Sequence, residues 1–284
     1  MVQVGIVTDS TSCLPAELIH QYNIRVVPAG FSIDNKPYRD QIDITNEEFW
    51  RLFKKARHLP TTSAIAPGEF INAFSDLMQG ADSIVCILVS KALSAIQSSA
   101  QQAREMSKAQ NPNLKIEIVD SKNSTGALGF VVLEAARAAR NGANLEQVIR
   151  IAEDMIPRVK FICVLDTLKY LIKGGRAPKT AYIGELLQVK PFIGMVSNKG
   201  VVDSLGKERG REKAVSRMVE MVKDYADVNK PLHLMVHYSD RIERGEKLRQ
   251  IVSKKYNCEE FYMTPFTPVM SCHTGPVLSL SFYS

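Results

Sequence analysis

Small hydroxyl side chains occur at four places where a predicted strand ends or a predicted helix begins. Hydroxyl groups and the free backbone N–H groups of a helix start can hold a small anion. Each segment alone has a simpler interpretation as a helix cap, because Ser, Thr and Asp are the usual N-cap residues. Together, with hardly any Lys or Arg among them, they predict a site for a weakly charged or small anionic head group rather than a polyphosphate. The segments are Thr8–Ser12, Ser90 with Ser94, Asp120-Ser121 with Ser124-Thr125, and Thr61–Ser63, which precedes Pro67-Gly68-Glu69.

Motifs for nucleotide, metal or nucleophilic chemistry are absent from the sequence. The segment Gly175–Thr180 fails the phosphate-loop pattern, because Lys173 and Pro178 occupy positions that require glycine, and no GxSxG elbow occurs. His273 lies in the Gly/Pro-containing segment Ser271–Pro276, where it is either an exposed loop residue or part of a site. The sequence therefore predicts no metal site, no cofactor and no catalytic residue. The histidines without partners at metal-ligand spacing are His20, His58, His233 and His237.

Composition and charge favour a cytosolic globular protein. The net charge is +6, but acidic residues are interleaved with the basic ones, as in RIERGEKLRQ, which is typical of solvated helix faces rather than of a nucleic-acid surface. No apolar run approaches the roughly 20 residues that span a bilayer, and the first ten residues resemble a strand rather than a signal peptide. The cysteines are scattered without a CxxC pair, which favours buried free thiols. They are Cys13, Cys86, Cys163, Cys258 and Cys272.

The elements that must position the hydroxyl segments alternate between strands and helices in the first half. Short aliphatic runs without alternation predict strands of a parallel sheet that is buried on both faces. The carboxyl ends of such strands share one edge, where this class of fold binds ligands, so the hydroxyl segments are expected to converge there. The expected strands are Val2–Val7, Ile24–Phe31, Ile84–Val89 and Leu114–Val119, and the expected helices are Glu69–Met78, Gly126–Arg140 and Leu145–Ile156.

The pattern changes near residue 160, which predicts an α/β domain over residues 1–160 and a second one over 161–284. The second part begins with an expected strand, Phe161–Leu165, and a short helix that ends at Gly174-Gly175. The segments Pro191–Val196 and Val201–Leu205 flank a turn containing Asn and Gly, which indicates a hairpin. A helical segment is expected at Ile183–Leu187, and further strands at Leu232–His237 and Pro276–Tyr283.

These motifs together resemble the DegV family of fatty-acid-binding proteins. The resemblance covers essentially the whole chain and keeps the order of the motifs. It implies an N-terminal three-layer α/β/α domain with a mainly parallel sheet, a smaller C-terminal two-layer α/β domain with a mixed sheet, and a long-chain fatty acid buried in the core of the first domain. The motifs are TDSTSCLP, Asp43 within IDIT, TTSAIAPGEF, SKALSAIQSSA, VDSKNSTGALG, LKYLIKGGR, KPFI with KERGREKA, and HTGP.

The resemblance also implies roles for individual residues. Thr62, Ser63 and Ser94 correspond to the residues that contact the fatty-acid carboxylate, and His273 to the histidine beside them. Arg176 corresponds to the basic residue that faces a partner. In part of the family that partner is a separate ATP-binding fatty acid kinase subunit, which phosphorylates the bound acid to an acyl phosphate for phospholipid synthesis. The resemblance thus implies a carrier without catalytic activity, expected here as a monomer whose membrane contacts are at most transient.

Several positions depart from the family pattern. Ala64-Ile65-Ala66 replaces the usual Gln-Pro-Ser, and the Ser94 segment lacks the usual Gly, Thr and aromatic residue. Val277 follows HTGP where a glycine is usual. The hydroxyls and the histidine are retained, whereas the neighbouring wall of the expected pocket is more aliphatic. The departures therefore concern the preferred length and unsaturation of the fatty acid rather than the binding of its head group.

Two other functions are open at this point. A hydrolase with Ser94 as nucleophile and His273 as base would act on a lipid-like substrate, but no third residue is placed by motif to orient the histidine. A regulatory or nucleic-acid-binding module is favoured only by the net charge.

Overall fold

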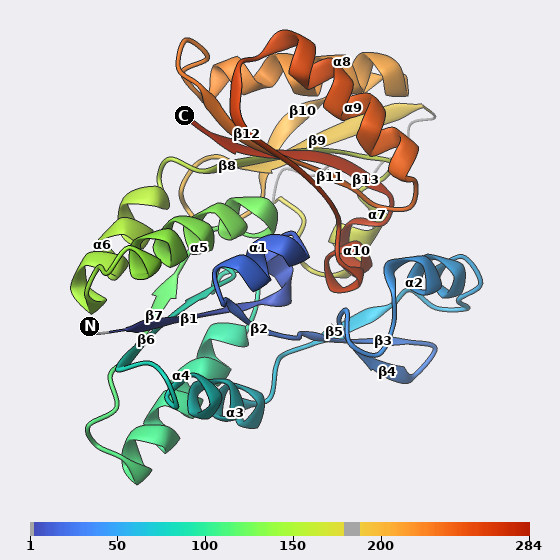
Figure 1. Ribbon diagram of the computed structural model, residues 1–284. Coiled ribbons are helices and arrows are strands. Elements are labelled where there is room, and N and C mark those ends of the chain that lie inside the picture. Colours follow the sequence, from blue (N-terminus) through green and yellow to red (C-terminus); the bar gives the residue numbers. More distant parts are fainter. Residues whose placement is uncertain (1–2, 179–187) are drawn as a thin grey trace.

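The computed structural model describes residues 3–178 and 188–284, and the expected helical segment Ile183–Leu187 lies outside them. Figure 1 shows the described chain as stacked layers, in which a parallel sheet and a mixed sheet are separated by helices and each carries further helices on its outer face. The α/β class expected from the sequence is therefore confirmed. None of the helices in the described ranges is both long and apolar enough to cross a membrane.

The parallel sheet belongs to the first half of the chain and has the order β2-β1-β6-β7. All residues of β1 and β6 are buried, as the continuous apolar runs predict for central strands covered on both faces. The hydroxyl segments after β1, β6 and β7 therefore begin at one edge of this sheet. The strands are β1 (Val4–Asp9), β2 (Arg25–Val27), β6 (Ser83–Leu88) and β7 (Ile116–Asp120).

The expected single strand Ile24–Phe31 is wrong, because the chain divides it between two sheets. Strand β2 ends at Val27, and Pro28 has no N–H group with which to continue a ladder. The N–H of Ala29 then donates to the hydroxyl oxygen of Ser10 at 3.1 Å, which turns the chain out of the parallel sheet. The rest of the run forms β3 (Gly30–Ile33), the central strand of an antiparallel sheet with β4 (Lys36–Arg39) and β5 (Thr61–Ser63).

Helices cover both faces of the parallel sheet, and one of them is enclosed on nearly every side. Helices α3 (Pro67–Leu77) and α4 (Ile96–Gln110) lie on the outer face, whereas α5 (Thr125–Arg140) and α6 (Leu145–Met155) lie on the inner face (Figure 1). The mixed sheet passes over α5, which explains why most of its residues are buried and only its C-terminal end reaches the surface. The shorter segments η1 (Ser10–Ser12), α1 (Ala16–Gln21) and α2 (Asn46–Phe53) complete this half.

The mixed sheet has the order β10-β9-β8-β13-β11-β12, and helices α8 and α9 cover its outer face (Figure 1). The predicted hairpin is confirmed: β9 and β10 pair antiparallel, and Asn198 and Gly200 of the connection have positive φ angles of 57° and 75°. The elements are β8 (Lys160–Leu165), β9 (Val189–Met195), β10 (Asp203–Arg209), α8 (Arg211–Glu220), η2 (Met221–Asp224), β11 (Leu232–Tyr238), α9 (Ile242–Lys255), β12 (Cys258–Pro265) and β13 (Val277–Tyr283).

The proposed division at residue 160 falls between the last helix of the parallel layer and the first strand of the mixed sheet. Helix α6 ends at Met155 and β8 begins at Lys160. Two short helices of the second part, α7 (Lys169–Lys173) and α10 (Pro268–Thr274), lie at the end of the molecule where β5 and α2 are found (Figure 1). We keep 1–160 and 161–284 as a proposed division.

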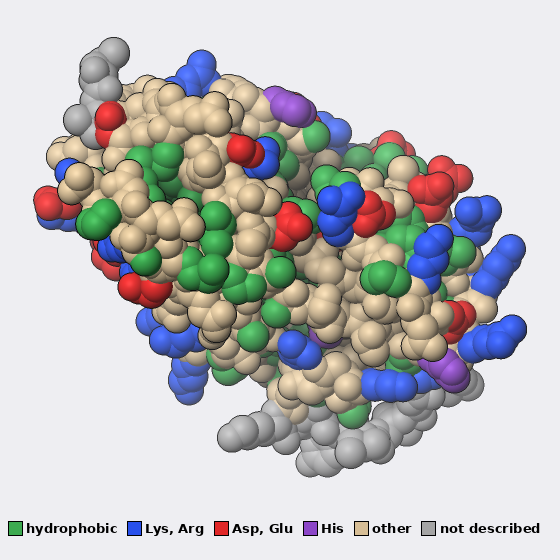
Figure 2. All heavy atoms as spheres, turned by 90° about the horizontal axis from the view of Figure 1, so that it is seen from below, with side chains coloured by type: hydrophobic (Ala, Val, Ile, Leu, Met, Phe, Trp, Pro, Cys, Tyr) green, Lys and Arg blue, Asp and Glu red, His purple; other side chains and the backbone are tan. Residues whose placement is uncertain are grey.

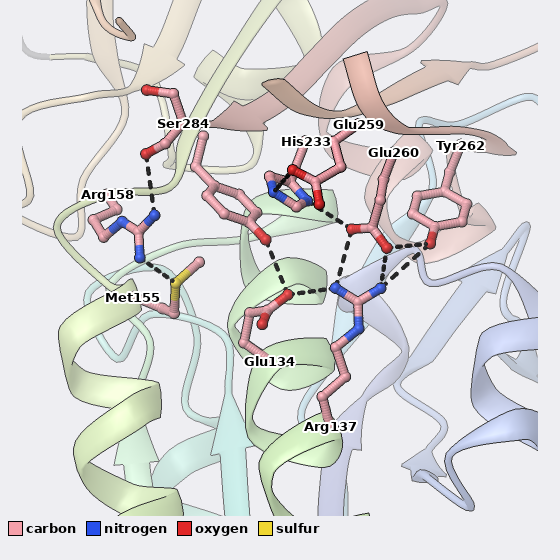
Figure 3. Close-up of polar contacts among 10 residues, drawn as sticks. Glu134, Arg137, Met155, Arg158, His233, Glu259, Glu260, Tyr262 and Ser284 are labelled. Atoms are coloured by element: carbon pink, nitrogen blue, oxygen red, sulfur yellow. Dashed lines mark hydrogen bonds and ion pairs between the residues drawn. The ribbon is translucent and has the colours of Figure 1, made fainter. Parts of the chain in front are cut away.

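A polar cluster joins the two parts on the side of α5 (Figure 3). The guanidinium of Arg137 on α5 donates to Glu134 at 2.6 Å and forms a two-pronged ion pair with Glu260 on β12. Glu260 also lies 2.7 Å from a ring nitrogen of His233, and Tyr283 donates to Glu134 at 2.9 Å. The four charged or ring-nitrogen partners are about one-fifth exposed and Tyr283 is buried, so the cluster fixes the contact between the parts with little competition from water.

Candidate ligand-binding site

A pocket lies between the carboxyl edge of the parallel sheet and the elements of the second part. Both parts of the chain line it, whereas the resemblance implies a fatty acid in the core of the first domain, which stays a prediction. The lining residues are Thr11, Ala29, Thr62, Ser63, Val89, Leu93, Ser94, Ile96, Ser124, Phe161, Leu171, Arg176, Ile193, Met195, Val202, Phe266, Val269, Met270, His273 and Thr274.

The predicted convergence of the hydroxyl segments is confirmed, because each of them contributes to this lining. Thr11 follows β1, Ser94 follows β6 and Ser124 follows β7. Thr62 and Ser63 arrive from elsewhere, on the edge strand β5, whose partner β3 brings them to the same opening. The sequence correctly placed three segments through the parallel sheet, whereas the fourth depends on an antiparallel sheet that was not expected.

A buried carboxylate, Asp9, fixes the edge of the sheet on which the pocket rests. One of its oxygens accepts hydrogen bonds from the N–H and the hydroxyl of Thr11 at 2.9 and 2.5 Å, and the other accepts the N–H of Val89 at 2.9 Å. Burial raises the pKa of Asp9, while these donors oppose the shift. The Thr11 hydroxyl is thereby committed to structure, and the segment after β1 serves mainly as support.

The helix-cap interpretation of the hydroxyl segments fails for Ser12 and Ser124. The residue at the N-cap of α1 is Pro15 rather than Ser12, and Ser124, at the N-cap of α5, makes no capping hydrogen bond. The Ser124 hydroxyl instead lies 3.3 Å from the sulfur of Met195, inside the pocket lining. Complete capping boxes occur at Thr45 and Asn144, away from the pocket.

His273 lies in the last turn of α10 and not in a loop, which corrects the sequence interpretation. Pro268 at the first helical position starts this helix, and Gly275 ends it with a φ of 62°. The Nε2 atom of His273 is 3.1 Å from the hydroxyl oxygen of Thr62, so residues 211 positions apart meet at one end of the pocket. Burial, with a smaller contribution from Arg176, lowers the pKa of His273 to about 4. At neutral pH the ring is therefore uncharged and has one donor and one acceptor nitrogen.

Arg176 lies at the same end of the pocket, where sequence reasoning did not place it. Its Nε donates to the carbonyl oxygen of Leu93 at 2.9 Å, and another guanidinium nitrogen donates to the carbonyl of Gly174. Gly175 has a φ of 69°, which lets the chain turn back toward the pocket after α7. Arg176 thus links the loop that contains Leu93 to the turn at Gly174-Gly175. Its charge lies on the side of the site where His273 is found. The glycine pair Gly174-Gly175 indicates a turn in the sequence, but the sequence does not show that this turn directs Arg176 toward the pocket.

The polar lining residues expected at the head-group site lie close to one another. Thr62 contacts His273, and Arg176 bonds the residue before Ser94. The hydroxyl oxygen of Ser94 accepts the N–H of Ile96 at 3.3 Å. Further hydroxyls in the lining come from Thr11, Ser63, Ser124 and Thr274. Most other lining side chains are aliphatic, aromatic or methionine. This arrangement suits a ligand with a small polar head and a long apolar tail.

The geometry gives little support to nucleophilic or metal chemistry. His273 contacts Thr62 rather than Ser94, and no carboxylate bonded to its ring is found in the part of the chain that the structure describes. Across residues 3–178 and 188–284, no group of three or more His, Cys, Asp or Glu side chains is placed to hold a metal ion.

Comparison with known proteins agrees with the architecture. A family model described as "uncharacterised protein, DegV family" matches residues 3–284. Protein DegV of Bacillus subtilis is 33% identical over 276 residues, which are 96% of each chain. The chain belongs to the DegV family. A DegV domain-containing protein of Caldanaerobacter subterraneus is 32% identical over 277 residues, which are 97% of this chain and 96% of that protein.

Solved structures of DegV relatives share the whole fold. A DegV family protein from Thermus thermophilus, described with fatty acid binding, superposes with a TM-score of 0.90 at 28% identity and covers 100% of both chains. The Bacillus subtilis DegV structure, described as a fatty acid binding protein, has a TM-score of 0.88 at 31% identity, over 100% of this chain and 99% of that one. A stearic acid-binding protein from Eubacterium ventriosum has a TM-score of 0.89 at 26% identity, over 100% and 98% of the chains.

Proposed function

We propose that this DegV protein binds a long-chain fatty acid in the pocket, with its carboxylate at the end formed by Thr62, Ser63, Ser94 and His273. The observation that carries the proposal is the pocket itself, in which the Thr62–His273 contact and Arg176 provide polar groups within a mostly apolar lining. Fatty acids reported in relatives with the same fold support it. The neutral His273 ring offers a ring N–H, and the hydroxyls offer further donors. Arg176 adds a positive charge near these donors.

Mass spectrometry of a solvent extract of the purified protein tests this proposal directly. We expect one long-chain fatty acid per chain, retained through purification because the tail is enclosed. An extract without fatty acid, together with no uptake of added palmitate, would exclude the proposal.

The head-group contacts predict a moderate loss of affinity for Thr62→Ala. This change removes one hydrogen-bond donor to a charged group, worth ~1.5–3 kcal/mol, so we expect roughly ten- to a hundredfold weaker binding of palmitate. Thr61→Ala is the matched control, because Thr61 is the exposed neighbour on β5 and does not line the pocket. Displacement of a fluorescent fatty acid measures both variants, and equal affinities would remove Thr62 from the head-group site.

We further propose that the protein is a non-catalytic carrier that presents the bound acid to a separate ATP-binding fatty acid kinase subunit. The polar end of the pocket is the end at which a carboxylate could meet a second protein. Arg176 lies there, and we propose that it contributes to this contact.

Arg176→Ala should separate lipid binding from acyl phosphate formation. Because Arg176 also lines the pocket, its loss should weaken fatty-acid binding, but the tail provides most of the affinity, so occupancy should persist at saturating fatty acid. Acyl phosphate formation with an added kinase subunit, measured at equal occupancy, should fall at least several-fold. Arg241→Ala is a suitable control, because its side chain is 61% exposed and does not line the pocket. Equal turnover of wild type and Arg176→Ala at limiting carrier would refute the role of Arg176. Consumption of ATP by the carrier alone would refute the non-catalytic proposal.

A further inference from the structure

A second hollow lies on the other side of α7 from the fatty-acid pocket. The segment that joins α2 to β5 forms one wall, and α7 forms the other. Its lining consists of Phe53, Ala56, Arg57, His58, Leu59, Pro60, Lys169, Tyr170 and Lys173. Leu171 of the same short helix lines the fatty-acid pocket instead, so α7 separates the two cavities.

The lining of this hollow carries positive charge without an acidic side chain. The cationic side chains in the lining are Arg57, Lys169 and Lys173. No ion pair within 4 Å involves these groups in the ranges 3–178 and 188–284. Figure 2 shows lysine and arginine side chains gathered on the side of the molecule that carries α2. Elsewhere many basic residues pair with acids, so this local excess of cations is unusual for the chain.

The backbone around these cations is held in place. The carboxylate of Asp34 accepts the N–H groups of Arg57 and His58, each at 3.1 Å, and these bonds lower the pKa of Asp34. Asp34 therefore offsets some of the positive charge while fixing the loop that carries Arg57. On α7, Lys169 and Lys173 are four residues apart and lie on one face of the helix.

An aromatic pair spans the two walls of the hollow. The rings of Phe53 and Tyr170 have centroids 5.5 Å apart, which joins α2 to α7. Tyr170 also lies against Gly275, where a Cβ atom would come within 2.3 Å of its ring. The hollow thus has an ordered base, although its lysine side chains are exposed.

We propose that this hollow binds the phosphoryl group of a small molecule. A phosphoryl dianion has several acceptor oxygens, so cations on both walls of the hollow can bind it at the same time. A carboxylate has only two oxygens and one negative charge and suits this arrangement less well. The concave shape limits the ligand to a compact group, and the interleaved charges elsewhere on the chain argue against an extended nucleic acid. This proposal does not depend on the ligand of the fatty-acid pocket, so the phosphoryl-binding proposal and the fatty-acid-binding proposal can each fail without the other.

Titration of the full chain with inorganic phosphate, followed by amide NMR at low salt, tests the proposal. We expect saturable shifts at Arg57, His58 and α7. Lys169→Gln with Lys173→Gln should weaken binding by about tenfold or more, because it removes charge-assisted hydrogen bonds. The control Lys207→Gln with Lys213→Gln makes the same charge change at exposed positions of β10 and α8 and should alter affinity less than about twofold.

Three results would overturn the proposal. One is a linear response that never saturates, and another is an equal loss of affinity in both double variants. The third is binding to phosphatidylglycerol vesicles without a saturable response to phosphate, which would assign the charge to membrane contact. Because the substituted lysines are exposed, an unchanged spectrum elsewhere will show that the variants fold.

Discussion

Butyrate is expected to bind this protein at least a thousandfold more weakly than palmitate. The reason is the extent of the apolar lining, which includes Phe161, Ile193, Met195 and Phe266. Burial of a methylene contributes ~0.8 kcal/mol, and palmitate has about twelve more methylenes than butyrate. If ordering of the tail cancels half of this contribution, about 5 kcal/mol remains, which corresponds to a factor of roughly 5,000.

Competition with a fluorescent fatty acid over a series of chain lengths measures this effect. Affinity should rise steeply from butyrate and level off when the tail exceeds the space available. Hexadecanol is the matched control, because it keeps the tail and loses the carboxylate; it should bind more weakly than palmitate but far more tightly than butyrate. Comparable affinities for butyrate and palmitate would show that the apolar lining does not hold the ligand.

The sequence predicted the elements whose burial follows one simple pattern. Strands β1 and β6 are buried on both faces, and their mostly apolar runs without polar alternation predict this burial. Strand β12 was missed because it lies at the edge of the mixed sheet and its side chains are mostly half-buried, so CEEFYMTP has no clear apolar pattern. The division of Ile24–Phe31 was missed because both resulting strands are apolar, and only Pro28 marks the change of sheet.

The candidate site was only partly predictable for a related reason. Hydroxyls that follow parallel strands share an edge by geometry alone, so Ser94 and Ser124 could be brought together without a structure. The meeting of Thr62 with His273 depends on how α10 docks against β5 across the two parts of the chain. The inward turn of Arg176 depends on a left-handed Gly175. No local sequence pattern specifies either contact.

Loss of Arg137 should destabilise the protein by about 2 kcal/mol at neutral pH. Arg137→Ala leaves Glu134 and Glu260 facing each other, with only His233, Tyr262 and Tyr283 to satisfy them (Figure 3). Breaking a fully buried ion pair costs more, about 3–5 kcal/mol, but these groups are about one-fifth exposed and partly screened. The midpoint of urea unfolding measures the change.

Arg140→Ala is the matched control for this prediction. Arg140 lies one turn further along α5, is exposed and also faces the ring of Tyr22, but it has no ion pair within the described residues. Its removal should cost no more than about 0.5 kcal/mol. Equal destabilisation by the two substitutions would mean that the ion pairs of Arg137 add nothing beyond a helix surface residue.

The pH dependence of stability tests whether the loss of the Arg137–Glu260 ion pair causes the destabilisation of Arg137→Ala. Burial alone would raise the pKa of Glu260, but hydrogen bonds from Arg137, His233 and Tyr262 outweigh it and lower the pKa below the ordinary value of 4.5. A carboxyl with a depressed folded-state pKa contributes stability above its unfolded pKa and loses it as pH falls through the folded value. The difference between wild type and Arg137→Ala should therefore be constant above about pH 6 and shrink below pH 4.5 as Glu260 becomes protonated. A difference that stays constant down to acid unfolding would assign the effect to lost packing of the arginine stem rather than to its charge.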